Sequence, residues 1–204
     1  METKQSLHLV FVCISNRVRS TLGEFLFPKM MRESNQRLVD EVKVSSAGFL
    51  PQILKDRLTE VGVRFPEPFY SRPMAEITRA ALLKKGFDVS GDWRSKELGP
   101  EMVEDADLMI TALPEQKEEL ISLFPKAQAK IFTLREMSKW DGYLFFEDFA
   151  IPPMDETFWD YVEEDPDYVS KVISITEETL IQAFPNILKQ LGVSEKRKNS
   201  LCKL

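Results

Sequence analysis

The chain is poor in the residues that build disulfide frameworks, metal centres and nucleotide-binding loops. Its 204 residues include two cysteines, one histidine and eight glycines. Cys13 and Cys202 cannot form a disulfide framework, and a single histidine leaves no spacing typical of a metal site. Neither G-x-G-x-x-G nor G-x-x-x-x-G-K occurs in the sequence. We therefore expect no metal and no cofactor.

Long apolar runs and an excess of basic residues are also missing. The longest purely apolar run, Leu9 to Ile14, is far shorter than the roughly 20 residues that cross a bilayer. Lys plus Arg number 27 and Asp plus Glu 33, and this net charge of −6 argues against a nucleic-acid-binding module. Met1 to Ser6 show no signal-peptide pattern. We expect a cytoplasmic protein that binds neither nucleic acid nor a membrane, and we make no prediction of its oligomeric state.

The composition is typical of a globular protein, with 43% hydrophobic and 29% charged residues. Short β-branched and aromatic runs alternate with amphipathic segments of helical spacing. Strands are predicted over 8–13, 42–46, 108–112 and 130–133, and helices over 21–32, 52–61, 74–85, 114–124 and 169–191. This alternation predicts an α/β fold, a doubly wound three-layer sandwich around a four-stranded parallel sheet in flavodoxin-like order. We expect one domain over 1–192, with insertions at about 49–72 and 141–166, and a polar tail over 193–204.

Several residues predict where helices begin and end. Thr21 followed by Glu24 has the spacing of a capping box. Pro114 suits the first position of a helix, and Gly86 suits the residue just after one. Pro185 should kink or split the last helix, because proline removes a hydrogen bond and clashes with the preceding turn.

The segment from Cys13 to Ser20 combines features that suit phosphate chemistry. It links the first predicted strand to the first predicted helix, and it places Arg19 six residues after Cys13. A loop of this size can wrap its backbone N–H groups around a tetrahedral anion, and the helix start adds positive potential. Arginine offers a planar fork for two phosphate oxygens, and the same surroundings favour the thiolate form of a cysteine. The sequence therefore predicts a nucleophilic cysteine beneath a bound phosphate.

This segment, with its flanks, resembles the signature loop of the low-molecular-weight protein tyrosine phosphatases and the related arsenate reductases. The match runs from Val10-Phe11-Val12-Cys13 to Arg19-Ser20, followed by Glu24. Further stretches that resemble the family, in the same order, are Ser45 to Gly48, Lys85 to Ser90 with Arg94-Ser95-Lys96 and Leu98, and Asp105 to Thr111. The resemblance covers most of residues 7–192.

The resemblance implies a role for each residue of the loop. Cys13 would be the nucleophile and form a phosphocysteine, and Arg19 would hold the phosphoryl oxygens and stabilise the transition state. Ser20 would donate a hydrogen bond to the thiolate. Asn16 would adopt a left-handed backbone conformation that keeps the loop preorganised. The rest of the phosphate-binding loop would be Ile14, Ser15, Arg17 and Val18.

The family's general acid is an Asp followed by Pro and aromatic residues, in the loop before the last helix, and here the match is weaker. Asp155 precedes Phe158 and Trp159, but no proline follows it directly. We favour Asp155 as the acid and expect Phe158 and Trp159 to line the substrate cleft. The alternatives are Asp148, Asp160 and Asp165, the last of which suits a turn and helix cap.

Together these residues favour a cysteine-dependent hydrolase acting on a phosphorylated protein or a small aryl phosphate. Arg17 and Val18 replace the family's usual small or aliphatic residue and its frequent second loop cysteine, so no local disulfide can protect Cys13. The alternatives are a non-catalytic phosphate-binding or regulatory relative, an arsenate reductase and a protein-arginine phosphatase. An arsenate reductase needs further cysteines, and Cys202 is the only other one. His8 lies on the first predicted strand and is expected in the core or at the sheet edge.

Overall fold

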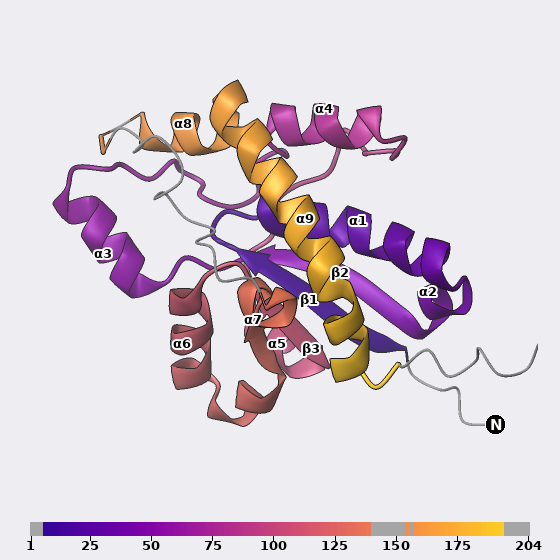
Figure 1. Cartoon of the computed structure of the whole chain (residues 1–204). Helices are drawn as coiled ribbons and strands as arrows, with labels where there is room; N and C mark the ends of the chain where they lie inside the picture. Colours follow the sequence, from indigo (N-terminus) through magenta and orange to yellow (C-terminus); the bar gives the residue numbers. More distant parts are fainter. Residues whose placement is uncertain (1–5, 140–153, 156, 194–204) are drawn as a thin grey trace, which may run out of the picture.

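A four-stranded parallel sheet forms the centre of the molecule (Figure 1). This computed structural model describes residues 6–139, 154, 155 and 157–193. The strands are β1 (Leu7–Cys13), β2 (Val42–Gly48), β3 (Leu108–Thr111) and β4 (Ile131–Thr133), in the order β2-β1-β3-β4. Every neighbouring pair is parallel, with Leu9 opposite both Val44 and Leu108. The predicted sheet and its flavodoxin-like arrangement are confirmed.

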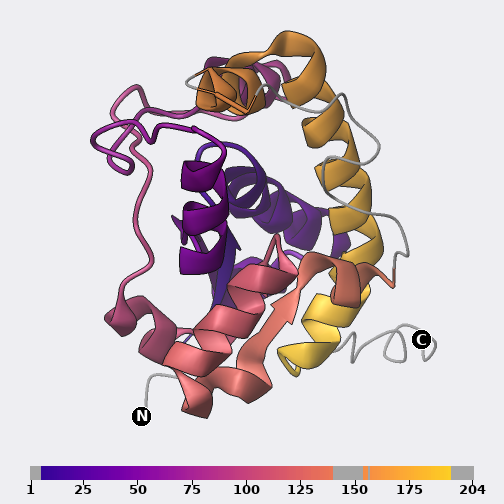
Figure 2. The same cartoon turned by 90° about the vertical axis from the view of Figure 1, so that its left-hand side faces the viewer.

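Helices cover both faces of the sheet, which gives the three layers that the sequence predicts (Figure 2). One face packs on α1 (Arg19–Ser34), α7 (Leu134–Ser138) and α9 (Pro166–Gln190), where Phe11, Phe27 and Leu180 share a core. The other face packs on α5 (Pro100–Asp105), α6 (Pro114–Leu123) and the 3-10 helix η1 (Pro125–Lys130). Both faces of β1 are therefore buried, as its apolar run from Leu9 to Cys13 requires.

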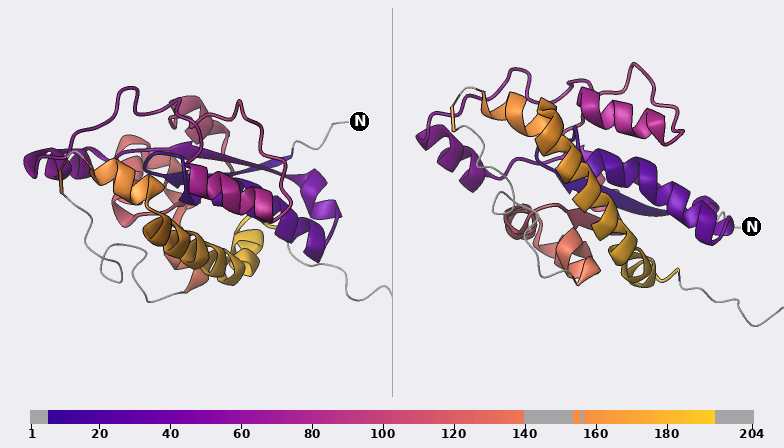
Figure 3. Two further views of the ribbon diagram at one scale, coloured as in Figure 1. Left: turned by 90° about the horizontal axis from the view of Figure 1, so that it is seen from above. Right: turned by 45° about the horizontal axis from the view of Figure 1, so that its top comes forward.

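The remaining helices lie around the ends of the sheet. They are α2 (Arg37–Glu41), α3 (Gln52–Glu60), α4 (Glu76–Lys84) and α8 (Phe158–Glu164). Figure 1 shows α8 above the arrowhead of β1 and α3 projecting to one side, and Figure 3 shows α4 beside the start of α9. None of the helices in the described part of the chain has the length and apolar content that a bilayer crossing requires.

Most of the predicted helix ends are confirmed. Pro114 is the first residue of α6, and Gly86 follows α4 with a positive φ of 83°. Pro185 does not split α9, which runs unbroken because the buried Ala183 and Ile187 hold both sides of the proline against the core. Helices α2, α5, α7 and α8 and the 3-10 helix η1 are absent from the prediction, since each is a short segment with little periodicity.

The predicted capping box at Thr21 and Glu24 is wrong. Helix α1 begins two residues earlier, at Arg19, so Thr21 lies inside its first turn. The hydroxyl of Thr21 donates to the carbonyl of Asn16 (2.9 Å), and the carboxylate of Glu24 accepts from Ser46 Oγ (2.7 Å). Both side chains therefore support the loop that precedes the helix.

Candidate active site

The loop from Cys13 to Val18 is buried throughout. Cys13 ends β1 with 2% of its surface exposed, and residues 14–18 lead directly into α1. Among the described residues, no backbone N–H of residues 14–18 donates to a backbone carbonyl. Buried N–H groups almost always have a partner, and such groups beside a helix start form a binding site for an anion. A loop with these features can hold a tetrahedral oxyanion over Cys13.

The side chain of Asn16 holds the loop in shape through three hydrogen bonds. Its φ of 58° confirms the predicted left-handed conformation, and its side chain is fully buried. Its Nδ2 donates to Ser20 Oγ (2.9 Å) and Ser46 Oγ (2.7 Å), and its Oδ1 accepts from the backbone N–H of Lys96 (2.8 Å). One side chain thus joins the loop, α1, β2 and the segment after α4.

The nucleophile candidate has the hydrogen bond that the sequence predicts. Ser20 Oγ donates to Cys13 Sγ at 3.0 Å, within the buried interior. Arg19, the first residue of α1, lines the same pocket as Cys13. Tyr168 lines it as well; its burial raises the pKa of its hydroxyl, and the nearby Arg19 guanidinium acts in the opposite direction. A thiol, a hydroxyl donor and a guanidinium therefore converge at one place.

The pocket above Cys13 is walled by aromatic and aliphatic side chains. Both predicted cleft residues, Phe158 and Trp159, line it. Behind them, the Trp159 ring packs against Phe65 and Phe69, at centroid distances of 5.4 and 5.0 Å. The insertion that contains Phe65 and Phe69 thus supports one wall of the site.

A third residue of that insertion, Tyr70, supports the loop through hydrogen bonds. The hydroxyl of Tyr70 donates to the carbonyl of Ile14 (3.2 Å) and accepts from the backbone N–H of Leu50 (3.1 Å). Burial raises the pKa of Tyr70, so it stays a neutral donor. Its ring lies against Gly48, where an added Cβ would come within 2.4 Å of Tyr70 Cε1 and 2.8 Å of the Ile14 carbonyl. Only glycine fits at this point.

Arg17 has a different place from the other loop residues. Its backbone belongs to the loop, but its guanidinium donates to the Pro73 carbonyl (2.7 Å) and to the carboxylates of Glu163 and Glu164 on α8. Glu163 is 2% exposed, lines the pocket and also pairs with Arg72 (2.9 Å). Sequence reasoning missed Glu163 and Tyr70, because each depends on a contact between distant parts of the chain.

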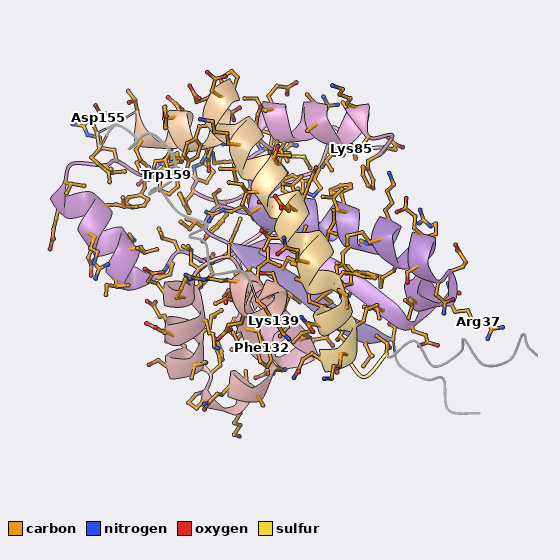
Figure 4. The ribbon with its side chains drawn as sticks, viewed as in Figure 1. Arg37, Lys85, Phe132, Lys139, Asp155 and Trp159 are labelled. Carbon is orange, nitrogen blue, oxygen red and sulfur yellow. The ribbon has the colours of Figure 1, made fainter. Side chains whose placement is uncertain are left out.

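Asp155 does not lie among the residues that line the pocket. It is exposed, and its carboxylate accepts from the backbone N–H (2.8 Å) and hydroxyl (2.7 Å) of Thr157 at the start of α8. These hydrogen bonds lower the pKa of Asp155. Figure 4 shows Asp155 at the periphery, beyond the start of α8, and Trp159 on the inner side of that helix.

The other candidate acids have these positions. Asp160 is exposed on α8, and Asp165 caps α9 by accepting from the backbone N–H of Tyr168 (2.8 Å), as predicted. Asp148 and Cys202 lie outside the described residues.

His8 is buried at the opposite end of β1 from Cys13, where its ring contacts Asp105 (2.9 Å) and Ser45 (2.7 Å). Over the described ranges no group of three or more His, Cys, Asp or Glu is placed to hold a metal ion.

Solved structures with this architecture match the chain over most of its length. An arginine phosphatase, YwlE from Geobacillus stearothermophilus, is 19% identical with a TM-score of 0.60, covering 90% of this chain and 94% of that one. A low molecular weight protein tyrosine phosphatase from Bacillus subtilis is 23% identical with a TM-score of 0.59, covering 91% and 97%. A protein tyrosine phosphatase from Entamoeba histolytica is 18% identical with a TM-score of 0.61, covering 92% and 99%.

No family model matches the chain, and neither does any curated protein sequence. At these identities the structural matches show a shared fold. The fold that the loop and its flanks imply is therefore confirmed.

Proposed function

We propose that this chain, which has the fold of the low-molecular-weight protein tyrosine phosphatases, is a cysteine-dependent phosphomonoesterase. The observation that carries the proposal is Cys13 at the end of β1, with Ser20 donating to its sulfur at 3.0 Å, in a loop whose backbone N–H groups donate to no backbone carbonyl of the described residues. The substrate class is an aryl phosphate, either phosphotyrosine in a protein or a small ester. The reaction needs a reduced thiol, which suits the cytoplasm.

The arrangement suggests a reaction in two steps. The Cys13 thiolate attacks phosphorus, the bond to the aryl oxygen breaks, and that oxygen takes a proton from a general acid as it leaves. Water then attacks phosphorus and gives a proton back to the deprotonated acid, the bond between sulfur and phosphorus breaks, phosphate is released, and Cys13 returns as a thiolate that Ser20 stabilises. Throughout, Arg19 and the loop N–H groups hold the phosphoryl oxygens, where charge is concentrated in the transition state.

Asp155 is the proposed general acid, supported by its position in the loop before the last helices. Its lowered pKa means that in the described conformation it is protonated only at acidic pH. An acid must carry its proton when the leaving group departs. If Asp155 is the acid, its pKa therefore confines hydrolysis of esters with poor leaving groups to acidic solution.

The test is hydrolysis of 4-methylphenyl phosphate, whose leaving group matches that of phosphotyrosine, from about pH 3 to 8, so that the range in which Asp155 carries its proton is included. We expect turnover by the wild type, none by Cys13→Ser, and a large decrease in Asp155→Asn but not in its exposed neighbour Asp160→Asn. Absence of turnover in the wild type would contradict the proposal. Turnover lost only in the cysteine variant would assign the acid to another residue.

A second candidate, phosphate binding without turnover, has one observation in its favour. Of the described residues that line the pocket, Glu163 is the only carboxylate, and it is paired with Arg17 and Arg72. A phosphate-binding relative would bind vanadate or phosphate by calorimetry, lose that binding in Arg19→Ala, and hydrolyse no aryl ester.

A further inference from the structure

A buried carboxylate borders the pocket above Cys13, although that pocket has to take up a negatively charged phosphoryl group. Glu163 on α8 is 2% exposed, and it is the only Asp or Glu among the described residues that line the pocket. Arg19 is the only Lys or Arg in the same described lining. Water and salt screen a charge with so little exposure only weakly, so the field of Glu163 acts on an anion bound in the pocket.

The positive partners of Glu163 do not line the pocket with it. Its Oε2 accepts from Arg17 and from Arg72 (2.9 Å), while its buried Oε1 has no hydrogen-bond partner among the described residues. The other guanidinium nitrogens of Arg17 donate to the Pro73 carbonyl (2.7 Å) and to Glu164, neither of which lines the pocket. The negative member of this group therefore borders the phosphate pocket, and the positive members do not.

Neighbouring contacts hold the Glu163 carboxylate in place. Glu164, the next residue of α8, accepts from Arg17 and from the backbone N–H of Glu76 (3.2 Å) at the start of α4. The backbone carbonyl of Arg17 accepts from the N–H of Ala75 (3.4 Å). A movement of Glu163 away from the pocket would separate buried ion pairs, and a buried charge without its partner is costly. The charge therefore stays beside the bound phosphate.

A fixed negative charge at this place affects substrate and product in the same way. Inorganic phosphate is released in the second step, and phosphate groups carry more than one negative charge near neutral pH. Repulsion that acts equally on the bound ester and on the bound product raises KM and weakens inhibition by phosphate, while the chemical steps are little changed. Arg19 and the loop N–H groups attract the anion, and Glu163 opposes them.

We propose that Glu163 sets the affinity of the site for phosphate: its carboxylate, held by Arg17 and Arg72, repels the bound anion and promotes release of the product. Glu163 acts through its electric field, so it is an affinity-setting residue and not a catalytic one. The inference rests on the proposed function, which makes inorganic phosphate the product, and it adds the residue that determines how tightly this product is held.

The test is calorimetry of the full chain with inorganic phosphate at neutral pH and fixed salt, together with the inhibition constant of phosphate in the hydrolysis of 4-methylphenyl phosphate. Glu163→Gln keeps the size of the side chain and an oxygen acceptor but removes the charge. We expect this variant to bind phosphate about tenfold more tightly, because two unit charges about 10 Å apart at an effective dielectric constant of about 20 change a binding constant by roughly this factor. KM and the inhibition constant should fall together.

Arg72→Gln is the opposite perturbation. It removes one positive partner of Glu163, on a side chain that is 19% exposed and does not line the pocket, so phosphate should bind about threefold to tenfold more weakly. Adding Glu163→Gln to Arg72→Gln should restore the affinity at least to that of the wild type. Damage to the fold or to the loop would weaken binding in every variant, so the tighter binding and the restoration separate the charge effect from a structural one.

Glu164→Gln is the matched control. It removes the same charge from the same group of ion pairs, but this carboxylate does not line the pocket and its side chain is 35% exposed. Water screens such a charge more strongly, so the affinity for phosphate should change less than about threefold.

Two results would overturn the inference while leaving the proposed function intact. One is a folded, active Glu163→Gln that binds phosphate no more tightly than the wild type. The other is an Arg72→Gln protein with wild-type affinity for phosphate. Absence of turnover by the wild type would instead refute the proposed function, and the inference with it.

Discussion

Replacing Asn16 with alanine tests how the phosphate loop is held. The substitution removes three buried hydrogen bonds, to Ser20, Ser46 and Lys96. The Lys96 N–H loses its acceptor, which costs about 1–3 kcal/mol, and the two serine contacts are worth about 0.5–1.5 kcal/mol each. Alanine also tolerates the φ of 58° less well than asparagine. We expect a loss of about 3–6 kcal/mol in the free energy of unfolding, a large part of the usual 5–15 kcal/mol.

Urea unfolding followed by circular dichroism measures this loss, and calorimetry with vanadate measures the effect on the loop. Asn16→Gly removes the same hydrogen bonds but suits a positive φ, so it should be more stable than Asn16→Ala by about 1 kcal/mol. Asn35→Ala, at an exposed turn after α1, is the control and should cost little. An Asn16→Ala protein with wild-type stability and vanadate affinity would refute the view that this side chain organises the loop.

Three further predictions concern the contact between Gly48 and Tyr70, the proposed acid Asp155, and Glu136 at the start of α7. Gly48→Ala should lower the free energy of unfolding by about 1–3 kcal/mol and weaken vanadate binding, because the new Cβ meets the Tyr70 ring. The control is Gly99→Ala, where an added Cβ meets no atom within 4 Å, and this variant should keep its stability in the same unfolding assay. Because the pKa of Asp155 is lowered, turnover of 4-methylphenyl phosphate should fall as pH rises through the acidic range, and an identical profile in Asp155→Asn would exclude it as the acid. Partial burial acts to raise the pKa of the Glu136 carboxyl, but hydrogen bonds from Lys117 and from Thr133, the N-cap residue of α7, outweigh it and lower that pKa. The ionised Glu136 carboxylate therefore stabilises the folded protein fully above the pKa that it has in the unfolded chain, and this stabilisation is lost as the pH falls through its pKa in the folded protein. Glu136→Gln should lower the free energy of unfolding by about 0.5–1 kcal/mol at neutral pH and make that free energy less dependent on pH on the acid side.

Local sequence patterns were sufficient to predict the sheet and the loop. The strand is apolar on both faces from Leu9 to Cys13, and a helix follows after a short polar segment, so strand, loop and helix are all visible within one window. The left-handed Asn16 and the Ser20 hydrogen bond were expected from the resemblance of this segment to the phosphatase signature loop, and both are present. These contacts join residues close in sequence, where pattern and spacing carry the information.

Contacts across the fold could not be predicted in this way. Arg17 and Glu163 are 146 positions apart, and no local pattern indicates that they pair. Thr21 and Glu24 have the spacing of a capping box, yet α1 begins at Arg19, so neither residue occupies a capping position, and their side chains bond to Asn16 and Ser46. Helix α8 has few residues and little periodicity, and its position is determined by the buried charges and aromatic rings that it contacts.

The central claim is that Cys13 forms a covalent phosphocysteine, and rapid acid quenching during turnover of 4-methylphenyl phosphate tests it most directly. Mass spectrometry of the digested wild-type protein should find one phosphoryl group on the peptide that contains Cys13. Ser20→Ala should increase the trapped fraction, because the departing thiolate loses its hydrogen-bond donor in the second step. Turnover with no phosphoryl group on that peptide, or a phosphoryl group on a different residue, would contradict the account.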